Sequence, residues 1–234
     1  MKLRLDKYLA DMSIGTRTEV KKLISKGLVT VNDSTVKKPE TKIDTEKDEV
    51  ICKGISVSYA EYEYYMLNKP QGVISATEDP NQETVLDLIS SKRKDLFPVG
   101  RLDKDTEGLL LITNDGQLAH RLLDPGKHVD KVYYARIDGC VTDRDVEAFK
   151  EGLDIGDDKK TLPGFLKILS SGDVSEIELT IHEGRFHQVK RMFQAVDKEV
   201  VFLKRLSMGG LSLDPKLKPG EYKELKKDEI DMLC

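Results

Sequence analysis

The sequence predicts an α+β protein in two parts: a small N-terminal module with two helices, and a larger domain built on a mixed, mostly antiparallel sheet. Near the start of the chain, apolar residues recur at helical spacing, whereas beyond residue 60 short apolar runs alternate with turn signals. The charge changes at the same place, because residues 1–60 carry a net charge of +3 and the rest of the chain carries −7. We therefore expect residues 1–59 to form the module and residues 60–234 the larger domain.

The N-terminal module begins with a predicted helix whose apolar residues lie at positions 5, 8, 9 and 12. A second helix is predicted to begin at Thr16, because Glu19 three residues later completes a capping box, and to end at Gly27. Strands are expected over residues 28–33 and 49–52, and a linker is expected over residues 55–62.

The second predicted helix is strongly basic. Arg17 lies four residues before Lys21, and Lys22 lies four residues before Lys26. Like charges at this spacing repel each other by about 0.2–0.5 kcal/mol. A phosphate backbone would offset that repulsion, so this helix is a candidate surface for a nucleic acid. The alternative is a plainly solvated helix face, and charge alone does not decide between them.

The larger domain contains many runs typical of strands. Pro70-Gln71-Gly72 and Asn114-Asp115-Gly116 are turn signals that follow two of these runs. Strict alternation over residues 176–181 predicts a strand with one buried face. Strands are predicted over residues 64–69, 73–75, 108–113, 131–137, 176–181 and 200–203, and helices over residues 117–123, 143–151 and 187–195.

Composition excludes several classes of protein. Hydrophobic residues make up 38% and charged residues 34%, which is typical of a globular protein. No apolar run approaches the ~18 residues of a membrane span, and early charges argue against a signal peptide. Cys52, Cys140 and Cys234 are far apart, so we expect free thiols in a reducing cytoplasm rather than disulfides or a zinc site. The histidines lack metal-ligand spacing, so we expect surface or packing roles for them and no metal.

The loop over residues 97–108 concentrates charge immediately before an apolar strand. It places Asp103, Asp105 and Glu107 beside Arg101 and Lys104. Neighbouring cations stabilise an ionised carboxylate, and a positioned carboxylate can act as a nucleophile or a base. Asp103 is therefore a candidate catalytic residue. The alternative is a turn aspartate that bonds its own backbone, which composition alone favours.

Residues 183–192 form a second basic cluster that opens a predicted helix. Backbone N–H groups at a helix start, with Arg185 nearby, can bind a phosphate or a carboxylate. Elsewhere, Tyr133 and Tyr134 are neighbours in a predicted strand, so their side chains should point to opposite faces. One of them could stack on an unpaired base in a cleft. Solvated basic residues and ordinary strand aromatics are the alternatives.

Residues 4–9, 16–24 and 27–32 resemble an S4 RNA-binding module. The resemblance covers about the first sixty residues. It implies that Arg17, Lys21, Lys22 and the following strand face RNA. Such modules occur in several kinds of RNA protein, so the resemblance says nothing about chemistry.

The whole chain resembles the ribosomal RNA pseudouridine synthases that carry an S4 module, and within them the branch acting on small-subunit (16S) rRNA. The order and spacing of the motifs cover nearly the whole sequence. They are LNKPQGV at 67–73, PVGRLD at 98–103, TEGLLLITNDG at 106–116, KVY at 131–133, EGRFHQVKRM at 183–192, LKR at 203–205 and GG at 209–210.

The resemblance assigns roles to five residues of the larger domain. Asp103 matches the family's essential aspartate, and Tyr133 the active-site tyrosine that contacts the base. Arg185 matches the basic residue that pairs with the aspartate. Leu203 matches an apolar contact to the base, and Arg101 a residue that helps to hold RNA.

The reaction implied by the resemblance converts a specific uridine of 16S rRNA to pseudouridine, through a base flipped out of its stack. It involves no redox step, so no cofactor or metal is expected. The implied partner is ribosomal RNA within a small-subunit assembly intermediate, with the enzyme a cytoplasmic monomer that binds no membrane. The alternatives are the same reaction on 23S rRNA, a non-catalytic ribosome-assembly factor, and a hydrolase that pairs Asp103 with Asp105 or Glu107.

Overall fold

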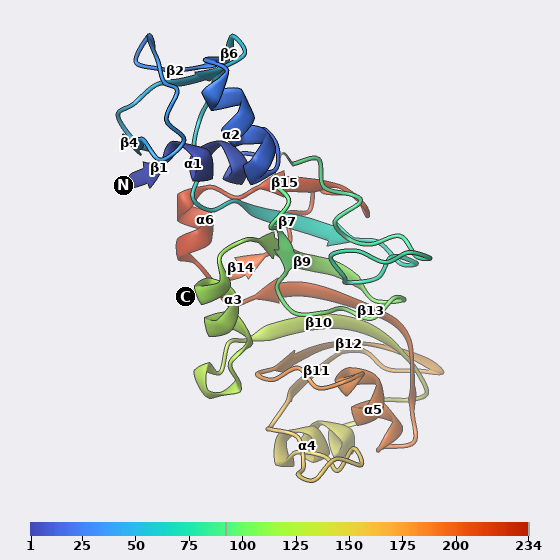
Figure 1. Cartoon of the computed structure of the whole chain (residues 1–234). Coiled ribbons are helices and arrows are strands. Elements are labelled where there is room, and N and C mark those ends of the chain that lie inside the picture. The colour runs from blue at the N-terminus through green and yellow to red at the C-terminus, as the bar shows by residue number, and fades with distance from the viewer. Residues whose placement is uncertain (92, 234) are drawn as a thin grey trace. The chain divides into compact units, whose positions relative to one another are not determined.

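A computed structural model describes residues 1–91 and 93–233 of the chain (Figure 1). The chain forms two compact units. The first comprises Met1–Tyr62 together with Ser90–Asp95, and the second comprises Glu63–Ile89 and Leu96–Cys234. Each unit has its own hydrophobic core, and the α+β fold class predicted from the sequence is confirmed.

The first unit packs two helices against two small sheets. Its elements are β1 (Lys2–Arg4), α1 (Leu5–Asp11), α2 (Arg17–Ser25), β2 (Val29–Val31), β3 (Ser34–Thr35), β4 (Lys42–Asp44), β5 (Val50–Cys52) and β6 (Ile55–Val57). Strand β1 pairs with β4, and the other four strands form a sheet in the order β3-β2-β5-β6. The expected linker therefore begins with a strand, because β6 pairs antiparallel with β5.

Both predicted helices of this unit are present. Leu5, Tyr8 and Leu9 of α1 are buried, and so are Val20 and Ile24 of α2. The capping box predicted at the start of α2 is also confirmed: the Thr16 hydroxyl accepts from the Glu19 backbone N–H, and the Glu19 carboxylate accepts from the Thr16 N–H. Burial of one face leaves the opposite face of α2 to its basic residues.

The second unit is organised by one mixed sheet of nine strands. Its main path runs β11-β12-β10-β13-β9-β7-β15, with β14 on β13 and β8 on β9. Its strands are β7 (Tyr64–Lys69), β8 (Phe97–Pro98), β9 (Glu107–Thr113), β10 (Lys131–Asp138), β11 (Phe165–Ser170), β12 (Val174–Ile181), β13 (Glu199–Met208), β14 (Leu211–Ser212) and β15 (Tyr222–Glu224). Its helices are α3 (Gly116–Leu123), the 3₁₀ turn η1 (Pro125–Lys127), α4 (Asp143–Glu151), α5 (Gln188–Gln194) and α6 (Lys227–Asp231).

Helices cover both faces of this sheet. Strand β9 is apolar and buried along almost its whole length, and alternate residues face different cores. Leu110 and Ile112 belong to the core that includes residues of α4 and α5, whereas Leu109 and Leu111 pack with residues of α3. A central strand with two covered faces explains why its sequence is a continuous apolar run rather than an alternating one.

Pairing in the sheet is antiparallel except between β9 and β13, which run parallel. Residues 73–75 were predicted to form a strand, but they make only an isolated bridge between Ile74 and Thr84. No helix within the described residues is long and apolar enough to cross a membrane. Cys52 and Cys140 are free thiols, and Cys234 lies outside the described residues.

Candidate active site

A small pocket opens on the α4/α5 face of the large sheet. Four segments that are distant in sequence build it: the loop before β9, strand β10, the segment from the end of β12 into α5, and strand β13. The lining residues are Arg101, Leu102, Asp103, Thr106, Tyr133, Ile181, Gly184, Arg185, His187, Gln188, Val189 and Leu203. The five residues predicted for this domain's site are thus brought together.

The loop that carries Asp103 is held by hydrogen bonds on both sides of the residue. The Ser75 hydroxyl donates to the Leu102 carbonyl at 2.8 Å and accepts from the Leu102 N–H at 3.0 Å. The Thr106 N–H donates to the Asp103 carbonyl at 3.0 Å, which closes the turn. Such fixation limits the positions available to the Asp103 carboxylate.

Lys69, at the end of β7, supports the same loop from inside the protein. Its side chain is fully buried, and its Nζ donates to the carbonyls of Pro70, Lys104 and Thr106 at 2.9, 3.4 and 3.0 Å. Burial lowers the pKa of Lys69 from 10.5 to about 8, against the opposing effect of the nearby loop carboxylates. Lys69 lies within the LNKPQGV motif, but no local sequence pattern indicates that its side chain is buried beneath this loop.

Two side chains of the α5 segment contact the Asp103 carboxylate. Lys190 Nζ lies 3.3 Å from Oδ2, and His187 Nε2 lies 3.6 Å from Oδ1. Lys190 also donates to both carboxylate oxygens of Asp105, at 2.6 and 2.8 Å. Burial opposes the charge on Asp105, but this bond from Lys190 holds its pKa below the ordinary value.

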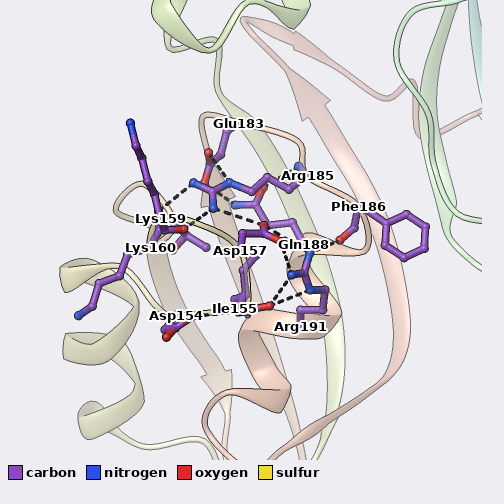
Figure 2. A network of polar contacts seen from close by, with 12 residues as sticks. Asp154, Ile155, Asp157, Lys159, Lys160, Glu183, Arg185, Phe186, Gln188 and Arg191 are labelled. Atoms are coloured by element: carbon purple, nitrogen blue, oxygen red, sulfur yellow. Dashed lines mark hydrogen bonds and ion pairs between the residues drawn. The ribbon is translucent and has the colours of Figure 1, made fainter.

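The pairing of Arg185 with Asp103 that the resemblance implied is wrong in this structure. Arg185 lines the pocket, but its guanidinium group donates to Glu183 Oε2 at 3.0 Å and to the carbonyls of Lys159 and Lys160 at 2.7 and 2.8 Å (Figure 2). Glu183 and two carbonyls of a neighbouring loop thus bind the Arg185 guanidinium group, which was expected to face Asp103. Lys190, five residues later and inside α5, takes that position.

His187 was expected to be a surface or packing residue, and it is partly exposed and packs on the Phe186 ring. It lies beside Asp103 and lines the pocket. Lys190 and His187 belong to the same EGRFHQVKRM motif, so the sequence located the right segment. Which of its side chains faces Asp103 depends on where α5 begins.

Tyr133 and Leu203 form the apolar wall of the pocket. Tyr133 is 7% exposed, and Leu203 on β13 pairs in register with Ala135 of β10. Tyr134 makes an edge contact with Phe202 instead, 6.0 Å between ring centroids. The two tyrosines therefore point to different faces, as the alternation predicted, and Tyr133 is the one in the pocket.

The predicted RNA-facing residues of the first unit lie on or beside α2. Lys21 and Lys22 line a shallow, open groove with Thr18, Ser25 and Lys26. Arg17 lies at the start of the helix and lines a separate hollow with Lys94. All three predicted residues are exposed to solvent. Among the residues described by the structure, no acidic, histidine and cysteine cluster could hold a metal ion.

The fold and the site together define an RNA-modifying enzyme with a separate RNA-binding module. The RNA pseudouridylate synthase family matches residues 63–195, and the S4 domain matches residues 3–50. The chain belongs to the RNA pseudouridylate synthase family, and it is a pseudouridine synthase with an N-terminal S4 domain.

Relatives share this organisation over their whole length. The chain is 48% identical to the RNA pseudouridine synthase YtzG of Bacillus subtilis, covering 99% of this chain and 98% of the relative. It is 40% identical to ribosomal small subunit pseudouridine synthase A of Pseudomonas aeruginosa, covering 97% and 99%, and 38% identical to that of Escherichia coli, covering 97% and 98%. A crystal structure of a pseudouridylate synthase superposes with a TM-score of 0.70 at 37% identity, covering 99% and 100%.

Proposed function

We propose that this enzyme isomerises one uridine of 16S ribosomal RNA, with Asp103 as the catalytic carboxylate. The observation that carries the proposal is the position of Asp103 beside Lys190 and His187, in a pocket that Tyr133 and Leu203 also line. The choice of small-subunit RNA is supported by relatives whose names specify that substrate and which match nearly end to end.

The reaction needs a group that can react with a nucleotide without any redox step. The glycosidic bond from N1 of uracil to the ribose breaks, the uracil turns, and a new bond forms from C5, which then loses its proton. An ionised carboxylate can attack the ribose or the base, or can accept the proton. Lys190 lies 3.3 Å from the Asp103 carboxylate and supplies a positive charge beside it. No cofactor or metal is required by this sequence of bonds.

The other pocket residues would bind the base. A uridine within a stack must be extruded before its reacting atoms can be reached, at a cost of a few kcal/mol. Tyr133 and Leu203 offer an aromatic and an apolar surface to the extruded uracil, and Arg101 lies at the exposed rim to hold the RNA. We assign Arg185 to shaping the pocket through its bonds to the loop 157–160.

The S4 domain would hold RNA away from the reacting nucleotide. Arg17, Lys21 and Lys22 supply positive charge for phosphate contacts, which position a protein on RNA without reading its sequence. We therefore expect this domain to set the affinity for RNA rather than the rate of the chemical step. The proposed partner is ribosomal RNA in an assembling small subunit, bound by a monomer.

The test is Asp103→Asn, assayed by tritium release from transcripts of 16S and 23S rRNA labelled at C5 of uracil. We expect the parent enzyme to release tritium from the 16S transcript, and the variant to lose activity while it still binds that RNA. Full activity of Asp103→Asn would show that Asp103 takes no part in the chemistry. Tritium release from the 23S transcript alone would show that the substrate is 23S rRNA and not 16S rRNA.

The hydrolase alternative has a direct readout in the same assay. Free uracil or an abasic site in the product would indicate hydrolysis, whereas an isomerised nucleoside excludes it. Among the described carboxylates of this loop, Asp103 lines the pocket, whereas Asp105 and Glu107 do not. This arrangement disfavours a pair of catalytic carboxylates.

A further inference from the structure

Phe186 lies at the rim of the active site with its side chain in solvent. It is 75% exposed, the largest value among the large hydrophobic side chains that the structure describes. Its ring stacks on that of His187, with 3.9 Å between centroids and 16° between planes. We propose that the Phe186–His187 stack is a platform for an unpaired RNA base next to the uridine that enters the pocket. This inference rests on the proposed function.

The position of the stack relates it to the chemistry. Arg185 and His187, on either side of Phe186 in sequence, both line the pocket. His187 Nε2 is 3.6 Å from the Asp103 carboxylate, so the same histidine ring contacts both Asp103 and Phe186. A base that stacked on the free face of Phe186 would therefore lie close to the residues that contact Asp103.

The segment that presents Phe186 is held rigidly by polar contacts (Figure 2). Arg191 Nη1 donates to the Phe186 carbonyl at 3.1 Å, and the same guanidinium group bonds Asp157 and the Ile155 carbonyl. On the other side, the Gln188 side chain accepts from the Arg185 N–H at 2.9 Å and donates to Glu183 at 3.0 Å. The Phe186 side chain points away from this network (Figure 2).

An exposed aromatic side chain on a hydrogen-bonded backbone suits a base as partner. Extruding a uridine removes its stacking contacts, and the neighbouring bases are then left with an exposed face. Base stacking on an aromatic side chain is tolerant of sequence and contributes about 1–3 kcal/mol per base. Because polar bonds already order the backbone that carries the ring, less conformational entropy is lost on binding than for a mobile loop.

The chain contains no tryptophan, so Phe186→Trp introduces a single fluorescent reporter. We expect titration with the 16S transcript to quench this fluorescence, with a midpoint equal to the RNA dissociation constant. The matched control is Phe165→Trp. Phe165 is also exposed, at 56%, and its ring also contacts a histidine, but it alternates with Leu166 of the pocket-side core and so faces the other side of the sheet. Its fluorescence should not change.

Substitutions separate stacking from a structural role. Phe186→Leu keeps an apolar side chain but removes the aromatic face, and we expect RNA affinity to fall about five- to hundredfold, the loss of one stacked base. Phe186→Tyr should retain affinity within about twofold, and Phe165→Leu should bind like the parent. All variants should melt at the parent temperature, because the Phe186 side chain contacts little of the protein beyond His187.

Unquenched fluorescence of Phe186→Trp at saturating RNA, or parent-like affinity of Phe186→Leu, would overturn the platform. If either result were accompanied by a change in the sedimentation of Phe186→Leu, the exposed ring would instead be a contact between copies of the protein. Tritium release by the parent enzyme shows whether the proposed function holds, so failure of the platform can be told apart from failure of that function. If the parent modifies only the 23S transcript, the substrate proposal fails, and the same titrations with that transcript test the platform.

Discussion

At the scale of single residues, the Asp103 carboxylate contacts two groups that lie three positions apart, His187 and Lys190. His187 is the N-cap of α5 and Lys190 lies in its first turn, so the start of α5 presents both to the loop. Lys190 is shared, because it also bonds both oxygens of Asp105. Its removal would leave two neighbouring carboxylates without their common cation.

We therefore expect Lys190→Met to lower the single-turnover rate on the order of a hundredfold, the usual cost of removing one charged partner from a catalytic site. The melting temperature should change little, because Lys190 lies at the surface of α5 and bonds only exposed or half-buried groups. Single-turnover kinetics at saturating RNA, with calorimetry on the same protein, measure both quantities.

Arg185→Met is the comparison, because the structure gives Arg185 a different role. Its bonds to Glu183 and to two loop carbonyls predict a loss of stability of about 1.5–3 kcal/mol, with a smaller effect on the rate. A large loss of rate at unchanged stability in Arg185→Met, together with an active Lys190→Met, would restore the pairing implied by the resemblance.

The sequence indicated which residues line the pocket better than it indicated which side chains contact each other there. Asp103 and Tyr133 could be located only through the family resemblance, because composition alone favours a turn aspartate and alternation does not say which tyrosine faces a cleft. The partner of Asp103 could not, because residues 183–192 offer three arginine or lysine side chains within seven positions. Only the observed start of α5 and the bonds of Arg185 to the loop 157–160 decide which cation faces the carboxylate.

Lys69 makes stability depend on pH through its lowered pKa. In the unfolded chain Lys69 keeps the ordinary pKa of 10.5, whereas in the folded protein the value is about 8. Between these values the unfolded state binds more protons, so stability rises with pH. The unfavourable contribution of Lys69 is complete below pH 8 and is relieved as the pH rises towards 10.5.

We expect this relief to be on the order of 3 kcal/mol, from a difference of about 2.5 pKa units. The measurement is urea unfolding of the parent and of Lys69→Met at pH 7.5 and 10.5. Other groups titrate in both proteins, so their effects cancel in the difference. The parent should gain stability relative to Lys69→Met over this interval; an unchanged difference would mean that Lys69 titrates normally.

At the scale of elements, predictions from sequence were best where one local pattern specified the element. The alternation of β12 and the apolar run of β9 each predicted a strand that the structure contains. Strand β6 was missed because Ile55-Ser56-Val57 is short, and its pairing with β5 supplies the reason for it to be extended. The parallel pairing of β9 with β13 joins residues about a hundred positions apart, which no local pattern encodes.

That parallel pair depends on Gly108. Its φ is +104°, and a Cβ there would lie 2.2 Å from the Arg205 carbonyl oxygen and 2.7 Å from the Arg205 nitrogen. Both neighbours are backbone atoms that cannot move aside. We expect Gly108→Ala to destabilise the protein by about 2–4 kcal/mol and to lower activity, because β13 carries Leu203 and β9 follows the Asp103 loop.

Gly116→Ala is the matched control for this substitution. Gly116 begins α3, has no neighbour within 4 Å of an added Cβ and has no positive φ. Alanine there should be neutral or stabilising by up to about 1 kcal/mol. Urea unfolding of the two variants compares them directly, and equal stability would show that the close approach of β9 and β13 can relax.

At the scale of the whole molecule, charge is divided between two units with separate cores. The overall charge of −4 alone would argue against a nucleic-acid partner, yet residues 1–60 carry +3. The first unit also receives Ser90–Asp95 from the later part of the chain, which brings Lys94 to the hollow beside Arg17. A local positive field, rather than the total charge, determines where a polyanion binds.

This division predicts that affinity and catalysis can be separated by mutation. Lys21→Glu with Lys22→Glu removes two candidate phosphate contacts from α2, and each contact contributes about 0.7–0.9 to the slope of log affinity against log salt. We expect weaker RNA binding and a slope reduced by about 1.4–1.8, while the single-turnover rate at saturating RNA stays near that of the parent. Lys2→Glu with Lys47→Glu makes the same change of charge at exposed positions outside α2 and should leave the slope nearly unchanged. If both double variants reduce the slope equally, the unit attracts RNA by its net charge alone, and α2 is not the surface that RNA contacts.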